Sequence, residues 1–423
     1  MRPKPHGVIL SAAKDLFVCA AVLLAGASRA QAQEPGTNLQ VYLMTMGPGA
    51  DIYERFGHNA IWVRDTVAHT DIVYNYGTFD FGGHRIVDLL AFGARFAMGP
   101  QRYWLGTMNL ENTLRLYTMV GRRLTAQELN LTPAERADIA SRLAVNALEE
   151  NKYYAYDYFR DNCSTRVRDL LDRELEGALK RATAGRPGEG TLRFHTRRSI
   201  TNDQLLFFLI DAAFGPRVDR PLDQWNEMFL PEKVQQRVRE VAVTGPTGDP
   251  LPLVKQEFTL LDLDIHHVAS APPQWGTRLF LIGLVIAVLI ALAAAPGRIA
   301  LVGRIVGGAW LLATGIAGLA LAFLWFITAH VATYANWNLF LLSPLALGLV
   351  PAFWHRANRS PPAWTPPLAL VLAGCVLGVI AARLVGFARQ DISVVAAMTA
   401  LPSVVAYLVV FGKSKREIGP SRF

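Results

Sequence analysis

One helix start organises the N-terminal half of the chain, where residues 161–169 read DNCSTRVRD. Asp161 or Asn162 is suited to cap this helix, because a short polar side chain can accept hydrogen bonds from the free N–H groups of the first turn. Beyond the cap, apolar residues recur at helical spacing, at Val167, Leu170, Leu171, Leu175 and Leu179. This periodicity predicts an amphipathic helix with one face packed on a core.

Strands precede this helix in the chain. Leu39–Met46 alternates as a strand does, and residues 59–64 and 72–76 are rich in β-branched and aromatic residues, with Gly or charged turns between them. Residues 132–135 (TPAE) form a capping box with proline at the first helical position, which predicts a helix to about residue 149. We therefore expect an α+β domain.

The two ends of the chain predict export and a membrane domain. Residues 1–32 combine an early basic region, an apolar run and small-x-small sequences, which predicts a cleaved signal peptide. About five apolar stretches follow the middle of the chain, at 279–295, 305–328, 339–354, 367–384 and 392–411. The third is short and contains Pro344 and Pro351, so we expect it to be kinked or partly interfacial.

These features divide the chain into five parts. The expected parts are a signal peptide (1–32), a globular domain (33–242), an extended connection (243–275), a transmembrane domain of about five helices (276–412) and a tail (413–423). Basic residues follow the first, third and fifth stretches, at Arg298, Arg304, His355, Arg356, Arg359, Lys413, Lys415 and Arg416. Because basic connections face the cytoplasm, we expect residues 33–275 outside the inner membrane and the C-terminus in the cytoplasm.

One of the three cysteines is a candidate nucleophile. Cys19 lies in the predicted signal peptide and Cys375 lies in an apolar stretch, so Cys163 is left alone in an exported domain. At a helix start, the unpaired N–H groups and the helix dipole favour negative charge, which lowers the pKa of a thiol. A buried, inert thiol is the alternative. We predict that Cys163 acts as a thiolate.

A thiolate nucleophile needs a base, and His58 is the best candidate. It lies in residues 56–63 (FGHNAIWV), where Gly57 allows close backbone approach and the following strand would hold the ring. A third polar group should orient the imidazole. His69, Asp71 and Asn75 share one face of the next strand, so spacing does not separate them; we favour Asp71.

Other features are weaker. The net charge of +8 comes without a basic run interleaved with aromatics, so nucleic acid is a poor candidate partner. His266 and His267 are adjacent and have no accompanying Cys, Asp or Glu set, so we predict no metal and no cofactor.

Arg166 is suited either to a phosphate or to the carboxylate at the helix cap. Asn336 and Asn338 lie, together with His330, at the outer membrane boundary, and these two asparagines are candidates for positioning substrate.

Three motifs in this order resemble the Lnb-type periplasmic domain family. They are residues 56–63, 71–81 (DIVYNYGTFDF) and 161–169, and residues 228–231 (MFLP) and 336–339 (NWNL) also look like family features. The family includes a membrane-anchored lipoprotein N-acyltransferase and is similar to permuted papain-like enzymes, such as lecithin-retinol acyltransferase, in which His precedes Cys. The resemblance implies a permuted papain-like fold, Cys163 as nucleophile and His58 as base.

The resemblance also implies a reaction. The thiolate would take a fatty acyl chain from a membrane phospholipid and pass it to the N-terminal amine of a lipoprotein, with helix-start N–H groups, near Asp161 and Asn162, stabilising the oxyanion. Two other enzymes fit the same pair of residues: a papain-like peptidase or amidase acting on cell-wall peptides, and a lipid hydrolase. A membrane scaffold with an inert thiol is the non-enzymatic alternative.

Overall fold

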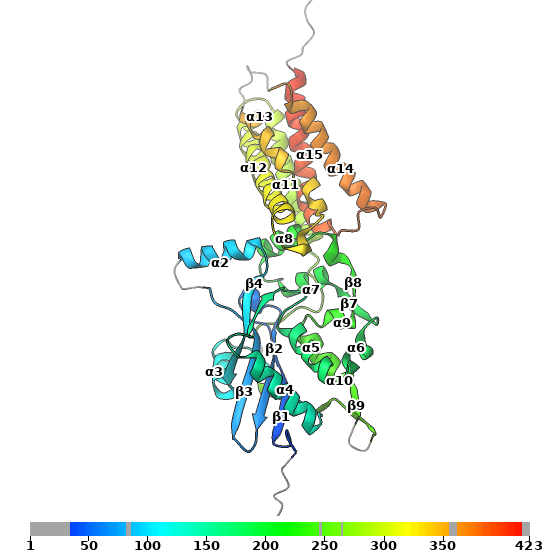
Figure 1. The fold of residues 1–423 in the computed structure, drawn as a ribbon. Coiled ribbons are helices and arrows are strands. Elements are labelled where there is room, and N and C mark those ends of the chain that lie inside the picture. The colour runs from blue at the N-terminus through cyan, green and yellow to red at the C-terminus, as the bar shows by residue number, and fades with distance from the viewer. Residues whose placement is uncertain (1–33, 82–85, 245–247, 264, 355–361, 417–423) are drawn as a thin grey trace, which may run out of the picture.

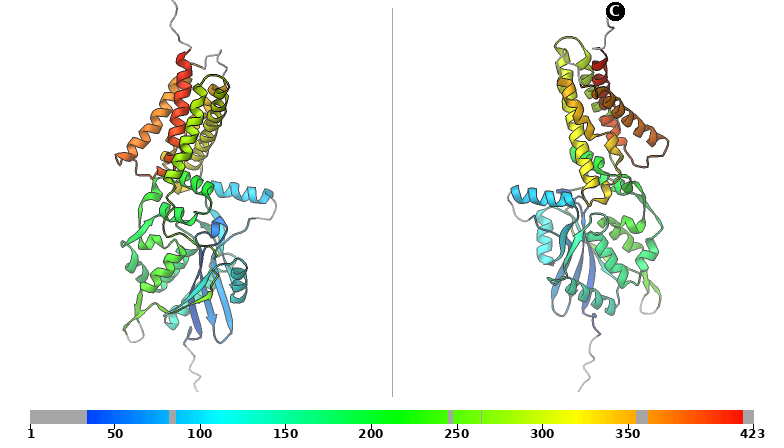
Figure 2. Two further views of the ribbon diagram at one scale, coloured as in Figure 1. Left: turned by 180° about the vertical axis from the view of Figure 1, so that it is seen from behind. Right: turned by 45° about the horizontal axis from the view of Figure 1, so that its top comes forward.

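The computed structural model describes residues 34–81, 86–244, 248–263, 265–354 and 362–416, so the predicted signal peptide lies outside the described residues. The described chain forms two parts that meet end to end (Figures 1 and 2). An α+β domain is followed by a bundle of long apolar helices. The predicted order of an α+β domain and a helical membrane domain is confirmed.

A seven-stranded antiparallel sheet is the frame of the α+β domain, with strands in the order β11-β5-β1-β2-β3-β4-β6. The bounds are β1 (Leu39–Met46), β2 (His58–Asp65), β3 (Thr70–Thr78), β4 (Gln101–Asn109), β5 (Leu124–Leu129), β6 (Tyr153–Tyr156) and β11 (Val254–Leu261). The three predicted strands correspond to β1, β2 and β3. These strands and β4 are neighbours both in the chain and in the sheet, as expected of a meander.

The connection predicted over residues 243–275 is not a simple extended linker. The strands β9 (Ala242–Thr244) and β10 (Pro250–Pro252) form a hairpin, and β11 then pairs with β5 at the edge of the main sheet. The prediction was wrong for β11 because the Pro and Gly residues that suggested a linker lie before and after this strand and not within it. The chain therefore completes the sheet before it turns toward the membrane.

Helices cover both faces of the sheet, and others, including α2 (Ile86–Met98) and α8 (Gln204–Ala213), lie at its membrane end (Figure 1). The other helices of the α+β domain are α3 (Leu110–Met119), α4 (Pro133–Asn146), α5 (Cys163–Glu174), α6 (Ala178–Thr183), α7 (Leu192–Ser199), α9 (Gln224–Glu227) and α10 (Pro231–Glu240). The main core lies between one face and α4, α5 and α10, where Leu43 and Ile61 meet Leu171. Tyr42 and Trp62 point to the opposite face, as the twofold alternation of strands requires.

The predicted helix starts are accurate. Thr132 accepts from the Glu135 N–H and the Glu135 carboxylate accepts from the Thr132 N–H, which is the predicted capping box of α4. The helix ends at Asn146, a little earlier than expected. The helix at Cys163 also has the predicted start, but it breaks after Glu174, because Glu176 and Gly177 both have a positive φ.

Among the described residues of the C-terminal part, four helical segments are long and apolar enough to cross a membrane: α11 (Gly276–Ala291) with the short turn η3 (Leu292–Ala294), α12 (Ile299–Phe326), α14 (Thr365–Leu384) and α15 (Ser393–Arg416). The third predicted stretch is instead a chain of short segments, η5 (Trp337–Phe340), η6 (Pro344–Leu349) and α13 (Val350–Trp354). Pro344 and Pro351 lie in it, as the prediction of a kinked segment required. The last helix continues to Arg416, so the tail predicted from residue 413 begins later.

A buried polar joint ties the α+β domain to the membrane helices. The side-chain amides of Asn336 and Asn338 donate to the carbonyls of Ala212 and Ala213, which end α8. Both asparagines are at most 1% exposed. They satisfy carbonyls that the helix itself leaves free. These contacts give both residues a structural role in the joint, and a role in positioning substrate stays a prediction.

Charged residues complete this joint. Arg193 donates to Asp211, Asp219 and the Phe214 carbonyl, and its side chain is 2% exposed. Arg197 bridges Asp211 of α8 and Asp391, which precedes α15, at 2.6 Å from each carboxylate. Each buried charge in this set has an oppositely charged partner, and the pair of Arg197 with Asp391 joins the two parts.

The helix α2 projects sideways at the level of the joint, and both rear and front views show it crossing the direction of the membrane helices (Figures 1 and 2). Val87 and Met98 on this helix are at least half exposed. The His330 ring donates to the Phe96 carbonyl at 2.6 Å, and the Ala329 N–H donates to the Met98 carbonyl. The link that follows α12 thus fixes the end of α2.

Candidate active site

Cys163 is the first residue of α5, and Asn162 is its N-cap. The Asn162 side-chain oxygen accepts from the N–H groups of Ser164 and Thr165, both at 2.9 Å, and the Thr165 hydroxyl accepts from the Asn162 N–H. The Asn162 amide also donates to the carbonyls of Tyr158 and Phe229. These contacts fix the helix start, and with it the cysteine, from two sides.

The cap role predicted for Asn162 is confirmed, and that for Asp161 is wrong. The Asp161 carboxylate pairs with Arg166 through two hydrogen bonds, at 2.6 and 2.8 Å. The Arg166 guanidinium also lies 3.7 Å from the centre of the Tyr154 ring. Of the two roles predicted for Arg166, the structure shows the contact with a carboxylate beside the cap.

His58 is the first residue of β2, and Gly57 explains how it is placed. Gly57 has a φ of 83°, and a Cβ there would lie 2.8 Å from the Met46 carbonyl oxygen. Only glycine fits this turn without moving the backbone of β1. The prediction of a close backbone approach before His58 is confirmed.

Asn75 of β3, and not Asp71, contacts the imidazole. His58 Nε2 lies 3.2 Å from Asn75 Oδ1, while the Asn75 amide nitrogen donates to the Val73 carbonyl. The amide is therefore oriented with its oxygen toward the ring, and Nε2–H is the donor. This leaves Nδ1 as the ring nitrogen available to the thiol.

The preference for Asp71 as the third residue is corrected by its contacts. Asp71 pairs in register with Arg64 and accepts from the Trp62 indole at 2.8 Å, further along β2 than His58. His69, the other alternative, lies in the turn before β3 with a φ of 52°. The three residues share strand parity, but only Asn75 is far enough along β3 to reach the start of β2.

The surroundings of Cys163 favour its ionised form. Burial raises the pKa of this thiol, but the charge and hydrogen bond of His58 outweigh burial, together with hydrogen bonds from the Asn59 N–H and the Ser164 hydroxyl. The net effect lowers the pKa of Cys163 to about 7, from an ordinary value of 9.0. Nucleophilic thiols in enzymes have pKa values lowered in this way.

A bulge and two tyrosines, Tyr154 and Tyr156, enclose the thiol, and the sequence did not assign them to the site. The pairing of β3 with β4 is irregular between Asn75 and Thr78, and Gly77 within it has a φ of 89°. A Cβ on Gly77 would lie 3.6 Å from the Cys163 Cβ and 3.7 Å from the Tyr156 ring. Bulges of this kind often lie beside active sites, where they redirect a side chain.

These contacts define what the site can do chemically. A thiolate beside an oriented imidazole can attack a carbonyl carbon, and the imidazolium can then protonate the leaving group. The Asn162 cap engages the N–H groups of Ser164 and Thr165, so the Cys163 N–H is the helix-start donor that this cap does not use. It is the backbone group best placed for an oxyanion.

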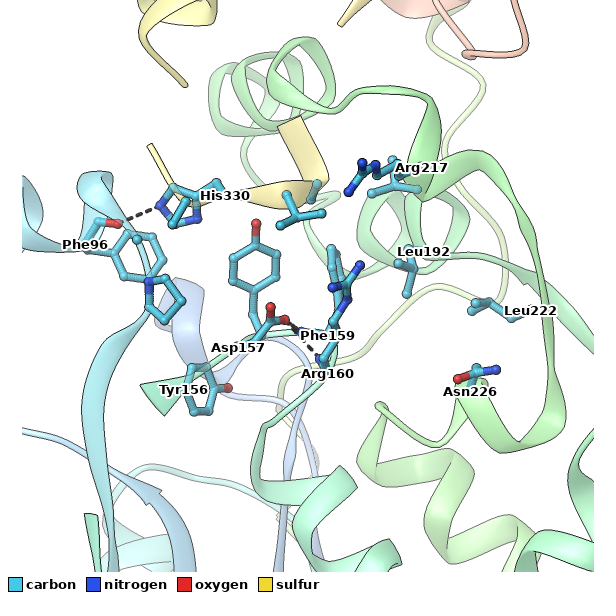
Figure 3. Close-up of a pocket in the computed structure, with 17 residues that line it drawn as sticks. Phe96, Tyr156, Asp157, Phe159, Arg160, Leu192, Arg217, Leu222, Asn226 and His330 are labelled. Atoms are coloured by element: carbon cyan, nitrogen blue, oxygen red, sulfur yellow. Dashed lines mark hydrogen bonds between the residues drawn. The ribbon is translucent and has the colours of Figure 1, made fainter. Parts of the chain in front are cut away.

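A cavity of about 160 Å³ lies between the site and the membrane helices (Figure 3). Residues 156–160, directly before the helix cap, form one wall, and Phe96 and His330 form another. Neither Cys163 nor His58 lines this cavity. Tyr156 lies between the cavity and the thiol, because its ring packs near Cys163 and also lines the cavity.

Comparisons with known families cover both parts of the chain. The Lnb N-terminal periplasmic domain matches residues 27–202, which hold Cys163, His58 and Asn75. The Lnb transmembrane domain matches residues 272–415. No curated protein and no solved structure matches the chain. With two domains in family order over most of its length, the chain belongs to the Lnb family of membrane-anchored proteins with a periplasmic domain.

Proposed function

We propose that this protein is a cysteine-dependent acyltransferase, in which Cys163 carries a fatty acyl chain from a membrane glycerolipid to the N-terminal amine of a lipoprotein. The observation that carries the proposal is the thiol at a helix start whose pKa is lowered to about 7 by His58. The membrane tether supports it further, since both substrates are anchored in a leaflet and a tethered site meets them by confined diffusion.

The first half-reaction forms a thioester. The His58 imidazole takes the thiol proton, and the Cys163 thiolate attacks the carbonyl carbon of the lipid ester. The Cys163 N–H stabilises the negative oxygen of the tetrahedral intermediate. The bond to the lipid alcohol then breaks, and the leaving oxygen takes the proton from His58, which gives an acyl-thioester and a lysolipid.

The second half-reaction uses the same groups in the opposite order. The α-amine of the lipidated N-terminal cysteine of the acceptor attacks the thioester carbonyl, and His58 removes a proton from the nitrogen. The carbon–sulfur bond breaks, which leaves an amide on the acceptor and a thiolate on Cys163. Asn75 keeps the imidazole oriented through both steps.

The proposal includes a location. The protein would lie in the inner membrane, with the catalytic domain in the periplasm and the C-terminus in the cytoplasm. The basic residues Lys413, Lys415 and Arg416 at the end of α15 support this orientation. The joint then holds the site at the periplasmic surface, next to the leaflet that contains both proposed substrates.

The test is mass spectrometry of lipoprotein N-terminal peptides from cells that depend on this protein. The unmodified protein should give N-acylated peptides, and Cys163→Ala should give free amino termini. Cys375→Ala is the matched control, because its thiol lies in α14, away from the site, and it should keep N-acylation. N-acylation that survives Cys163→Ala would rule the proposal out.

Incubation of the purified protein with single substrates separates the two hydrolytic alternatives. Purified protein incubated with phospholipid vesicles but without acceptor should accumulate the thioester; steady release of free fatty acid would instead identify a lipid hydrolase. Incubation with cell-wall peptides should release no new amino termini. Their release would identify a peptidase or amidase.

A further inference from the structure

We propose that the cavity between the catalytic domain and the membrane helices binds the phosphate of a glycerophospholipid headgroup, with Arg160 and Arg217 as its cationic partners. This inference rests on the proposed function, because it names the class of acyl donor. The donor would present its phosphate to the cavity while its acyl chains remain in the bilayer.

The cavity lies at the depth of lipid headgroups. The membrane helix α12 has 28 residues, so it is about 42 Å long at 1.5 Å per residue, and the hydrocarbon core is about 30 Å thick. The helix is therefore longer than the hydrocarbon core is thick. Residues 329–332, which line the cavity, lie just beyond its C-terminal end, where the chain leaves the hydrocarbon. The sideways helix α2 contributes Phe96 to the opposite wall at the same level (Figures 1 and 3).

The charge of the cavity suits an anion. Arg160 and Arg217 both line it, and in the described part of the chain neither guanidinium has a carboxylate partner. Arg217 lies over the Tyr334 ring at 5.6 Å. Asp157 is the acidic residue among those lining the cavity, and its carboxylate accepts from the N–H groups of Phe159 and Arg160. Guanidinium groups are well matched to phosphate oxygens.

The cavity also lies next to the thiol. Residues 156–160 line it and lead directly to the cap of α5, and Tyr156 packs beside both Gly77 and Cys163. Figure 3 shows His330 and Phe96 together on one side, Arg217 on the other, and Tyr156 below them. A headgroup held here would place its glycerol esters beside Tyr156, the residue that separates the cavity from Cys163.

The volume favours a headgroup over a whole lipid. About 160 Å³ is below the range of drug-sized ligand pockets, so it accommodates a phosphate and its substituent but no acyl chain. A free phosphate ion has the same oxygen chemistry, and the experiment has to separate these two sources.

The experiment measures acylation of Cys163 in the full-length protein in proteoliposomes, by intact mass, from two donors. One donor is phosphatidylglycerol in vesicles; the other is p-nitrophenyl butyrate, a soluble ester without phosphate. The double variant Arg160→Ala/Arg217→Ala should be acylated at least about tenfold more slowly from phosphatidylglycerol, because charge-assisted hydrogen bonds are lost. Its reaction with p-nitrophenyl butyrate should be unchanged, which also shows that it folds.

Two further variants sharpen the result. Arg220→Ala removes an exposed arginine three residues from Arg217 that does not line the cavity, and it should behave as the unmodified protein. Arg217→Lys keeps the charge and should recover part of the rate, since lysine contacts phosphate as a point charge. Inorganic phosphate, added as a competitor, should slow acylation from phosphatidylglycerol far less than a diether phosphatidylglycerol does, because the diether lipid has the same headgroup and no ester to react.

Each outcome has one meaning. Equal rates for the double variant and the unmodified protein with phosphatidylglycerol overturn the headgroup site alone. Inorganic phosphate that competes as well as the lipid overturns the lipid assignment, because the site then recognises a free ion. If the unmodified protein is acylated by neither donor, the proposed function itself fails.

Discussion

At the scale of single residues, the reactivity of Cys163 depends on a balance between burial, which raises its pKa, and His58, which lowers it. Alkylation by iodoacetamide reports this balance, because the thiolate is the reactive form. In a Cys375→Ala background, the rate should rise with pH around a midpoint of about 7. His58→Gln removes the two largest lowering causes, so its midpoint should move to 9 or higher.

The expected difference is large. At pH 7, a thiol with a pKa of 7 is half ionised, whereas one with a pKa of 9.0 is about 1% ionised, so the His58→Gln variant should react about 50-fold more slowly. Equal midpoints in the two proteins would show that His58 does not set the charge of the thiol.

Asn75 and Asp71 can be separated by substitution. Asn75→Ala removes the acceptor for His58 Nε2, so the ring loses its orientation, and kcat should fall by roughly tenfold to a hundredfold, about 1–3 kcal/mol. The KM should change little, since Asn75 acts through His58. Asp71→Asn keeps an oxygen for the Trp62 indole and should keep full activity. Loss of activity in Asp71→Asn, with Asn75→Ala active, would restore Asp71 as the orienting residue.

At the scale of secondary structure, local chemistry was predictable from the sequence and long-range placement was not. The starts of α4 and α5 follow from short-range rules, in which a polar cap and its partner lie three residues apart. The strands β1, β2 and β3 follow from alternation over a few residues. Cys163 and His58 were found because each lies at the start of such an element.

The choice among His69, Asp71 and Asn75 shows where local rules end. All three have the same parity in the sequence, and the register that places Asn75 beside His58 depends on the length of the turn between β2 and β3. Likewise, the pairing of β11 with β5 joins residues separated by more than a hundred positions. Asn336 and Asn338 looked like surface residues because their partner, the end of α8, is also remote in sequence.

At the scale of the whole molecule, the joint between the two parts should matter for transfer but not for the thiol. Asp391→Ala removes the carboxylate that Arg197 reaches at 2.6 Å, and leaves a largely buried cation without this partner. Acyl transfer from vesicles should fall severalfold and the melting temperature should drop, while alkylation of Cys163 at pH 7 stays normal.

The matched control for this prediction is Asp262→Ala. Its carboxylate is 81% exposed and lies 3.7 Å from Arg123, so the pair adds little to stability. Slower alkylation in Asp391→Ala, in step with slower transfer, would show instead that the substitution perturbs the site itself.

The joint has one more consequence. Asn336, Asn338 and Arg197 hold the catalytic domain as a rigid extension of the membrane helices. A domain that is fixed in this way does not reorient between its two proposed substrates, so each substrate must diffuse to it. Under the proposed function, the lysolipid would then be exchanged for a lipoprotein by lateral diffusion in the membrane. The fluidity of the surrounding leaflet, more than any hinge in the protein, would set the rate of turnover.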